Sequence, residues 1–410
     1  MTNLISGIIA AIIALTACSG CADTSEAALI SPAVALPSAD AVPAEYDGEP
    51  SVFNAKLSEA LLKSQDSTKN TVYSPFSLYA VLAMLWEGAG GQTLAELDAV
   101  LGSDDGLAED MYATLSHLLT LEATTLNITN SVWVDNRFEP KQTYLEALAG
   151  SYMAECYTAD LASSEARINS YIEKRTNGLI KKMLGDTDLD GAVMALVNTV
   201  YLDAEWQSSF KKESTHKRDF TNADGSVKSI DFMYNGTRYE SVIDTDLCVG
   251  VSMPYKDGSL TFVALMPKDE SMTAAELTKR VMTETSYASL AKSAVGESTR
   301  LYMPKFETEL FLNLKETLID MGIVSAFTGS ADFSGIANDI MVDNVLQKAV
   351  IRVDEKGTEA AAATVATMKC TSAAPVMNPR VLDFNRPFSF AVIDTVTGVV
   401  LFCGEHNVAG

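Results

Sequence analysis

The sequence predicts an α+β fold with antiparallel or mixed sheets. Segments with helical spacing of apolar residues lead the chain, whereas strand patterns dominate its later part. Helices and strands do not alternate as they would in a parallel βαβ array, and no internal repeat is visible. With 410 residues, of which 47% are hydrophobic, the chain is long enough to bury a large core.

The helices are predicted from apolar spacing and from their start signals. Ser74 followed by Pro75 is typical of a helix start, because serine caps free backbone N–H groups and proline suits the first turn. The glycines that follow are expected to end this helix. Helices are expected at 51–62, from Pro75 to the glycines at 88–91, at about 165–184 and at about 310–322.

The strands are predicted from two patterns. Residues 125–134 have apolar side chains at alternate positions, which is typical of a half-buried strand. Residues 192–202 are almost continuously apolar and include β-branched members, which favours a strand buried on both faces. Further strand-like runs occur at 227–234, 248–254, 259–266, 299–306, 347–353, 387–394 and 398–403.

The first residues predict export. An apolar, uncharged run ends at Cys18, and Leu15-Thr16-Ala17-Cys18 resembles the bacterial lipobox. The run is shorter than the roughly 20 residues of a comfortable membrane span. We therefore expect residues 1–17 to be a lipoprotein signal peptide, with Cys18 lipidated and the protein anchored to the bacterial cell surface or released outside the cell. Because Met1-Thr2-Asn3 lacks a basic residue, a plain secretory signal is the alternative.

Residues 18–50 are predicted to form a disordered acidic tether. They are rich in Ala, Ser, Pro and acidic residues and show no sustained apolar period. The globular part is expected to begin near Ser51.

Charge and reactive residues limit the function. The formal net charge of −24 argues against nucleic acid and anionic membrane surfaces as partners, so membrane contact is expected only through the lipid anchor. The six cysteines do not form two CxxC motifs in the CxxC…CxxC arrangement of zinc sites, and the three histidines form no HExxH motif, so neither a metal nor a cofactor is expected. No GxSxG nucleophile elbow occurs, which argues against a serine hydrolase.

Four segments, in this order, carry a family resemblance. They read NTVYSPFSLYAVLAMLWEGAGGQTLAEL at 70–97, ALVNTVYLDAEWQSSF at 195–210, VLQKAVIRVDEKGTEAAAAT at 345–364 and DFNRPFSFAVIDTVTGVVLFCGEHNV at 383–408. Together they resemble the serpin family of serine protease inhibitors, over roughly residues 51–410.

The resemblance implies one domain over 51–410, with three β-sheets, eight or nine helices and an exposed reactive loop. It also implies a mechanism for a monomeric inhibitor. A serine protease cleaves the loop and forms a covalent acyl-enzyme. The freed loop then inserts as a new central strand of the main sheet, and the distorted protease stays trapped.

The hinge of the loop meets the physical requirement for insertion. In an inserted strand, alternate side chains lie under the sheet, so one parity must be small or apolar and uncharged. Residues 358, 360, 362, 364 and 366 are Thr or Ala, whereas Glu359 lies on the opposite parity. The hinge residues are Glu355, Gly357, Thr358, Glu359, Ala360, Ala361, Ala362 and Ala363.

The reactive-site bond follows from counting within the resemblance. With Glu355 as the first residue, the seventeenth is Thr371, which predicts cleavage between Thr371 and Ser372. Cleavage after Cys370 or after Lys369 remains an alternative. Small residues around this bond favour an elastase-like protease, whereas Lys369 would suit a trypsin-like pocket.

Other positions match the family's sheet-opening region. They are Ser74, Ser77, Asn198, Gln347, Trp206 and Lys305. Gln347 stands where many members have a histidine, and it can donate and accept hydrogen bonds but cannot become charged. Trp206 matches the point of first insertion, and Lys305 is expected to pair with Glu355. Ordinary packing is the alternative reading of these residues, and a non-inhibitory serpin that acts as a binding or chaperone protein is the alternative function.

Overall fold

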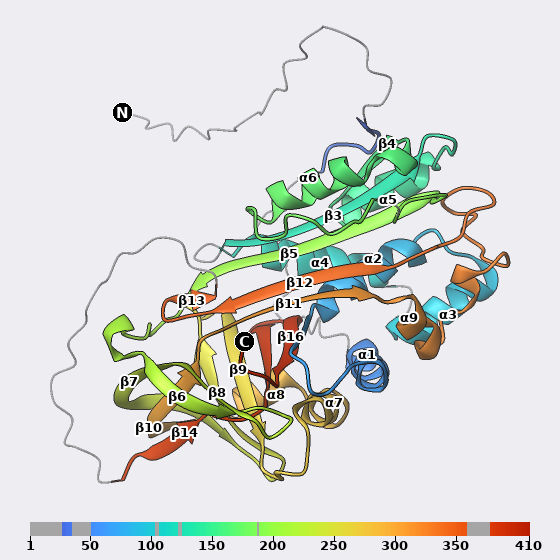
Figure 1. Ribbon diagram of the computed structural model, residues 1–410. Helices are drawn as coiled ribbons and strands as arrows, with labels where there is room; N and C mark the ends of the chain where they lie inside the picture. Colours follow the sequence, from blue (N-terminus) through green and yellow to red (C-terminus); the bar gives the residue numbers. More distant parts are fainter. Residues whose placement is uncertain (1–26, 35–50, 103–105, 122–124, 187, 359–377) are drawn as a thin grey trace, which may run out of the picture.

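The computed structural model describes residues 27–34, 51–102, 106–121, 125–186, 188–358 and 378–410 (Figure 1). The predicted lipidation site Cys18, the hinge residues from Glu359 onward and the predicted reactive-site bond lie outside these ranges. Two sheets and a set of helices make up the described part, so the α+β class is confirmed.

The main sheet crosses the middle of Figure 1 and has seven strands in the described part of the chain. In spatial order they are β1 (Ala28–Leu29), β4 (Ala154–Ala159), β3 (Thr125–Asp135), β5 (Met194–Glu205), β13 (Gly357–Thr358), β12 (Leu346–Val353) and β11 (Phe306–Asn313). The very short strand β13 therefore lies between two long strands.

The second sheet lies at the lower left of Figure 1. Its order is β14 (Arg380–Asp383), β10 (Val295–Pro304), β7 (Val227–Asp244), β8 (Cys248–Pro254), β9 (Leu260–Pro267), β15 (Phe388–Asp394), β16 (Val400–His406) and β2 (Thr71–Tyr73), while β6 (His216–Thr221) also pairs with β7. Three sheets were expected. The described strands form two hydrogen-bonded sheets instead, because the 18-residue strand β7 pairs with β6, β10 and β8 and joins them.

Nine α-helices occur among the described residues, within the expected eight or nine. They are α1 (Ser51–Ser64), α2 (Pro75–Trp86), α3 (Gly91–Leu101), α4 (Leu107–Leu119), α5 (Gln142–Ser151), α6 (Glu165–Arg175), α7 (Ala274–Glu284), α8 (Tyr287–Lys292) and α9 (Lys315–Met321), with short 3₁₀ turns η2 (Leu161–Ser163), η3 (Lys212–Ser214) and η4 (Ser325–Phe327). None of the helices that the structure describes is long and apolar enough to span a membrane.

The predicted start of α2 is confirmed. The helix begins at Pro75, and the Ser74 hydroxyl accepts a hydrogen bond of 3.1 Å from the Ser77 backbone N–H. This cap replaces one of the backbone hydrogen bonds that a first turn lacks. The start of α2 is therefore held in a defined place below the main sheet.

Two helix boundaries differ from the prediction. The helix expected over 165–184 ends at Arg175, because Asn177 and Gly178 have φ of 50° and 80° and turn the chain into the left-handed region. The helix expected from 310 begins at Lys315, because residues 306–313 form β11 and pair with β12 along its whole length. In this segment, pairing with β12 therefore outweighs the helical spacing of the apolar residues.

Part of the predicted tether is ordered. Ala28 and Leu29 pair with Tyr157 and Thr158 of β4, and the Ile30 N–H donates to the Cys156 carbonyl at 2.8 Å. Within the predicted tether, residues 28–31 thus make backbone hydrogen bonds to β4. The physical reason is that β4 would otherwise present unpaired backbone groups at the edge of the main sheet.

The core divides at the main sheet, with one apolar cluster on each of its faces. The larger apolar cluster fills the space between the two sheets and includes buried residues of every described α-helix except α6. A smaller cluster, which includes Trp133, Ile168 and Ile172, lies between α6 and the outer face of the main sheet. Helix α6 therefore covers β3 and β5 on the face opposite α2 (Figure 1).

Candidate functional site: an open strand position in the main sheet

The hinge enters the main sheet between β5 and β12. Gly357 and Thr358 pair antiparallel with Glu205 and Ala204 of β5, and Thr358 also pairs with Val353 of β12. Over the described residues, β5 and β12 are joined only through this short strand. The hinge residues Gly357 and Thr358 therefore already occupy a strand position between β5 and β12, and no described strand occupies the rest of this open position.

The side chain of Thr358 lies under the sheet. It is 3% exposed, and its hydroxyl shares a hydrogen bond of 2.6 Å with the hydroxyl of Tyr255. The Tyr255 ring in turn stacks on Trp206, with 4.7 Å between the ring centroids. This placement agrees with the parity argument, which assigns Thr358 to the buried face.

Gly357 is required by a close approach of the backbone. A Cβ atom at this position would lie 1.9 Å from the carbonyl oxygen of Ala204. Any larger residue would push the hinge away from β5. The glycine therefore allows the hinge to enter the sheet.

Trp206 holds the residues that precede β13. Its backbone N–H donates to the Lys356 carbonyl at 2.7 Å, and its indole Nε1–H donates to the Asp354 carbonyl at 2.8 Å. The Phe210 N–H donates to the Glu355 carbonyl at 2.7 Å. Together these bonds attach the turn before β13 to the segment after β5.

Glu355 makes the ion pair that the resemblance implied. Its carboxylate lies 2.8 Å from Lys305 Nζ and accepts a hydrogen bond of 2.7 Å from the Thr215 hydroxyl. Burial alone would raise the pKa of this carboxyl, but the hydrogen bonds from Lys305 and Thr215 outweigh it and hold the pKa below its ordinary value. Glu355 is therefore charged at neutral pH and connects the hinge to the second sheet.

A chain of polar side chains links α2 to β5 in the middle of the main sheet. The Ser77 hydroxyl donates to Asn198 Oδ1, and Asn198 Nδ2 donates to Asn130 Oδ1. Asn130 Nδ2 then donates to the Tyr152 carbonyl at 2.8 Å. Each amide thus acts as both donor and acceptor, which satisfies these groups below the sheet.

A second set of hydrogen bonds links α2 to β12. The Ser74 N–H donates to Gln347 Oε1 at 3.0 Å, and Gln347 Nε2 donates to the Ser74 carbonyl at 2.9 Å. Gln347 therefore uses both amide atoms, as its chemistry predicted. Since Asn198 and Gln347 belong to the two strands on either side of the open position, the first turn of α2 lies beneath that position.

Asn130 and Tyr255 belong to the site but were not predicted. Asn130 carried a readable signal, because it interrupts the apolar parity of Leu126, Ile128 and Val132 on the buried face of β3. Tyr255 carried none, because its contact with Thr358 joins residues 103 positions apart. Only the folded chain identifies Tyr255.

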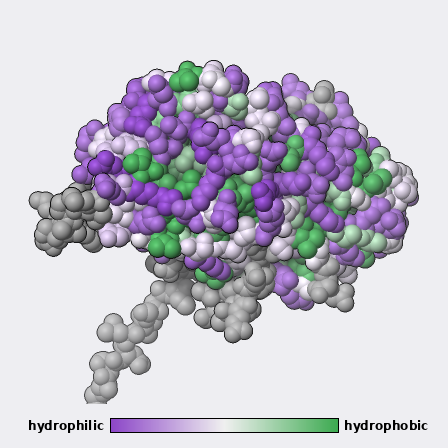
Figure 2. Space-filling view, turned by 90° about the horizontal axis from the view of Figure 1, so that it is seen from below, coloured by the Kyte–Doolittle hydropathy of each residue, from purple (hydrophilic) through white to green (hydrophobic). Residues whose placement is uncertain are grey.

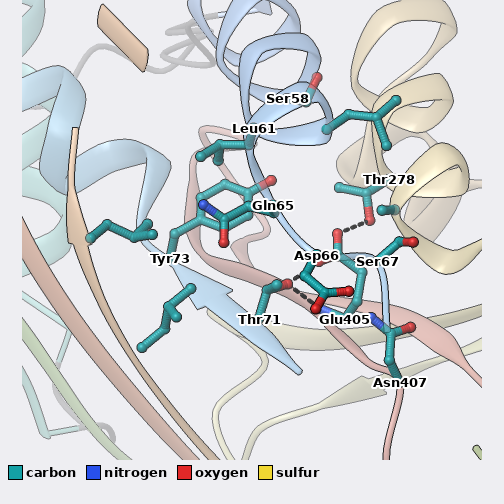
Figure 3. Close-up of a pocket in the computed structure, with 14 residues that line it drawn as sticks. Ser58, Leu61, Gln65, Asp66, Ser67, Thr71, Tyr73, Thr278, Glu405 and Asn407 are labelled. Carbon is teal, nitrogen blue, oxygen red and sulfur yellow. Dashed lines mark hydrogen bonds between the residues drawn. The ribbon is translucent and has the colours of Figure 1, made fainter. Parts of the chain in front are cut away.

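A separate pocket lies between α1, α7 and β16 (Figure 3). Glu405 is buried there, and its carboxylate accepts hydrogen bonds from Thr71 and, at 2.6 Å, from Thr278 (Figure 3). Burial raises the pKa of Glu405, although the two threonine hydroxyls oppose this. Because threonine hydroxyls occupy both carboxylate oxygens, Glu405 is a structural group, apart from the hinge.

Comparison with known proteins gives a consistent result. A family model for serpins, serine protease inhibitors, matches residues 50–408. Iris from Ixodes ricinus is 31% identical over 374 residues, which cover 86% of this chain and 96% of Iris. The human plasma serine protease inhibitor is 30% identical and is covered to 88%, over 87% of this chain. The crystal structure of the thermophilic serpin tengpin in its native state matches with a TM-score of 0.79 and 32% identity, over 88% of this chain and 94% of tengpin.

The chain therefore belongs to the serpin family. Serpins are generally protease inhibitors rather than enzymes, and they generally target serine proteases. These family properties agree with the hinge geometry described above.

Proposed function

We propose that this serpin is an inhibitory member that traps serine proteases by inserting its cleaved loop into the main sheet. The observation that carries the proposal is the position of β13. The hinge is already paired with both β5 and β12 at the entrance of the open strand position. Insertion of the cleaved loop would extend β13 along β5 and β12.

The register of β13 predicts where the following residues would lie. A strand that continues antiparallel from Thr358 would place Ala360 between Leu202 and Ile351, both of which are buried. It would place Thr364 between Asn198 and Gln347, where a hydroxyl can bond with both amides. The sequence of the hinge therefore suits the buried face of this position residue by residue.

The direct test is covalent complex formation. The soluble domain is incubated with pancreatic or neutrophil elastase and examined for a complex that survives boiling in SDS. We expect such a complex, because an ester bond joins the serpin and the protease in a trapped acyl-enzyme, and SDS does not break a covalent bond. Complete cleavage of the loop without this complex would contradict inhibition and would favour the non-inhibitory alternative.

A pair of hinge variants tests insertion itself. Ala360→Arg should convert the inhibitor into a substrate, because its charge would have to lie under the sheet near Leu202 and Ile351, at a cost of several kcal/mol. Ala361→Arg is the matched control, since its side chain would lie on the opposite face. The ratio of trapped to cleaved serpin on SDS gels measures both variants. Equal behaviour of the two would contradict the insertion geometry.

The reactive-site bond is proposed between Thr371 and Ser372, with an elastase-like protease as the favoured target. Mass spectrometry of the released C-terminal fragment should show Ser372 at its start. A fragment that starts at Thr371 or Cys370 would assign cleavage to Cys370 or Lys369 instead, and cleavage after Lys369 would favour a trypsin-like protease.

We also propose that Cys18 carries a lipid that anchors the exported protein. In cells, Cys18→Ser should move the protein from the membrane fraction to the soluble fraction, because the remaining chain is strongly acidic. Unchanged membrane association would contradict this anchor.

A further inference from the structure

Residues 27–34 form a docked segment along one edge of the main sheet. Within it, β1 pairs antiparallel with β4, and both backbone groups of Cys156 in β4 are bonded to the segment. The Cys156 carbonyl accepts a hydrogen bond from the Ile30 N–H at 2.8 Å, and the Cys156 N–H donates to the Ser31 hydroxyl at 3.1 Å. The docked segment is therefore an additional strand of this sheet.

The side chains of the docked segment also suit this edge. Ile30 and Val34 pack against the larger apolar cluster, and Ala27 packs against the smaller one. Residues 27–36 carry no charge, whereas the stretches on either side contain Asp and Glu. Burial of apolar side chains therefore favours docking of this part of the chain.

The docked segment begins at the end of the main sheet that lies opposite the hinge. Through the pairing of β1 with β4, β4 with β3 and β3 with β5, Ala28 lies level with Met194, the first residue of β5. Near the other end of β5, Ala204 pairs with Thr358 of the hinge. The strand between Met194 and Ala204 is about 33 Å long. Figure 1 shows β1 and β13 toward opposite ends of the sheet.

The length of the chain limits how far the docked segment lies from the proposed lipid. Ala28 follows Cys18 by ten residues, which span at most about 36 Å when fully extended. Ser51 follows Cys18 by 33 residues, which could span more than about 100 Å. Docking therefore cuts the maximum reach of the anchor to about one-third. The hinge end could face the membrane only if residues 18–27 were drawn out to almost their full length.

The surface of the domain does not favour membrane contact. The formal net charge of −24 opposes binding to anionic lipids. The face seen in Figure 2 is mostly hydrophilic, with apolar residues in scattered patches. The point at which the lipid anchor is attached therefore decides how the domain stands on a membrane.

We propose that the docked segment holds the lipid-anchored serpin with its hinge end away from the membrane, where the reactive loop meets soluble rather than membrane-bound proteases. The inference rests on the proposed lipid anchor and on the proposed inhibitory function. It follows from two features of the chain, namely the short reach between lipid and docked segment and the placement of β1 opposite the hinge.

The test measures the orientation by fluorescence energy transfer. Full-length lipidated protein is placed on vesicles that contain an acceptor lipid, with a donor dye at Asp190→Cys before β5 or at Gln207→Cys after it, both exposed positions. Cys21→Ser and Cys370→Ser remove other labelling sites, since Cys156, Cys248 and Cys403 are buried. Transfer should be at least about twofold more efficient from the Asp190 position, because β5 spans about 40 Å.

Two variants lengthen the free anchor in different ways. Ile30→Asp should release the docked segment, because its carboxylate would lie against the apolar cluster. An insertion of about 20 Gly and Ser residues after Asp23 lengthens the anchor without touching the segment. Both should make transfer from the two labels equal. Leu29→Asp is the matched control and should keep the difference, since Leu29 is 52% exposed.

Trapping rates test the consequence for partners. Soluble elastase should form the SDS-stable complex equally fast with vesicle-bound wild type and Ile30→Asp. Elastase coupled to the same vesicles should react several-fold faster with Ile30→Asp, because only a longer anchor lets the hinge end turn toward the membrane.

The outcomes separate this inference from the functions on which it rests. Equal transfer from both labels in membrane-bound wild type would overturn the orientation alone. A wild type that carries no lipid would overturn the anchor and this inference with it. Failure to trap soluble elastase would overturn the inhibitory function and the statement about partners, whereas the fluorescence decides the orientation independently.

Discussion

The two sheets of this serpin differ in how their central strands are held. In the second sheet, β9 and β15 are hydrogen-bonded on both sides and buried along their whole length. In the main sheet, β5 and β12 are paired on their outer sides, but between them the described residues provide only β13. The central strands of the second sheet are thus paired on both sides, whereas the main sheet has an open strand position between β5 and β12.

The contacts beneath the two sheets differ in kind. Under the second sheet, rings pack against one another, as Phe390 does with Phe262 and Phe306. Under the open position of the main sheet, Ser77, Asn198 and Gln347 make hydrogen bonds. A hydrogen bond contributes only about 1 kcal/mol net and can be exchanged for another, whereas removing a large core ring costs about 3–5 kcal/mol. The open position is thus built from contacts that can be replaced.

The largest expected effect is in the second sheet. Phe390→Ala should lower the free energy of unfolding by about 3–5 kcal/mol, because the ring is fully buried among other rings and leaves a cavity. Denaturant unfolding, followed by near-ultraviolet circular dichroism, measures the change. Phe311→Ala on the exposed side of β11 is the control and should cost less than about 1 kcal/mol. A small effect at Phe390 would mean that the second sheet is not the rigid part.

The second-largest effect is a dependence of the folding stability on pH, and it also arises in the second sheet. His406 is buried among Phe220, Phe306 and Phe388, and burial lowers its pKa to about 3. Because the folded pKa lies below the unfolded value of about 6.5, stability is complete above that value and is lost as the pH falls toward 3.

At pH 5 the loss from His406 should be about 2 kcal/mol relative to pH 8. The melting temperature of His406→Leu should show a correspondingly weaker acid dependence between pH 8 and pH 5. His216→Leu, at an exposed position, should keep the acid dependence of wild type. Identical pH profiles for wild type and His406→Leu would contradict this assignment.

A third and smaller effect is expected at the open position. Asn198→Ala should cost about 1–2 kcal/mol, because Asn130 Oδ1 and the Ser77 hydroxyl both lose their partner. The control is Asn313→Ala, since Asn313 is bonded to Asn344 in an exposed place. Denaturant unfolding measures both. A cost at Asn198 as large as that at Phe390 would remove the distinction between replaceable and fixed contacts.

The smallest effect is expected where the two sheets are linked. His117 of α4, which packs on β3, makes a bond of 2.9 Å with the buried Asp394 of β15, and this hydrogen bond raises the pKa of His117. A raised folded pKa means that this stabilisation is complete below the unfolded value of about 6.5 and is lost as the pH rises through the folded pKa.

His117→Gln should therefore cost about 1 kcal/mol at pH 6 and less at pH 9. Melting temperatures of the variant and wild type over this range provide the measurement. The sign is opposite to that of His406, so the two variants serve as controls for each other. A larger cost at pH 9 than at pH 6 would contradict the charged form of His117 in the pair.

Local sequence determined the α+β class, the capped start of α2 and the strands β3, β5 and β12. It also determined the small residues on one parity of the hinge. These features depend on neighbouring residues and on simple periods, so they can be read without the fold. The resemblance supplied the family and the residues of the sheet-opening region.

Tertiary structure decided the rest. It placed Gly357 and Thr358 between β5 and β12, brought Asn130 to Asn198, and ordered residues 27–34 against β4. It also ended the helix expected over 165–184 at Arg175 and made a strand of residues 306–313. The physical reason is that strand pairing joins residues far apart in the chain, and no local period records which backbone groups will find a partner.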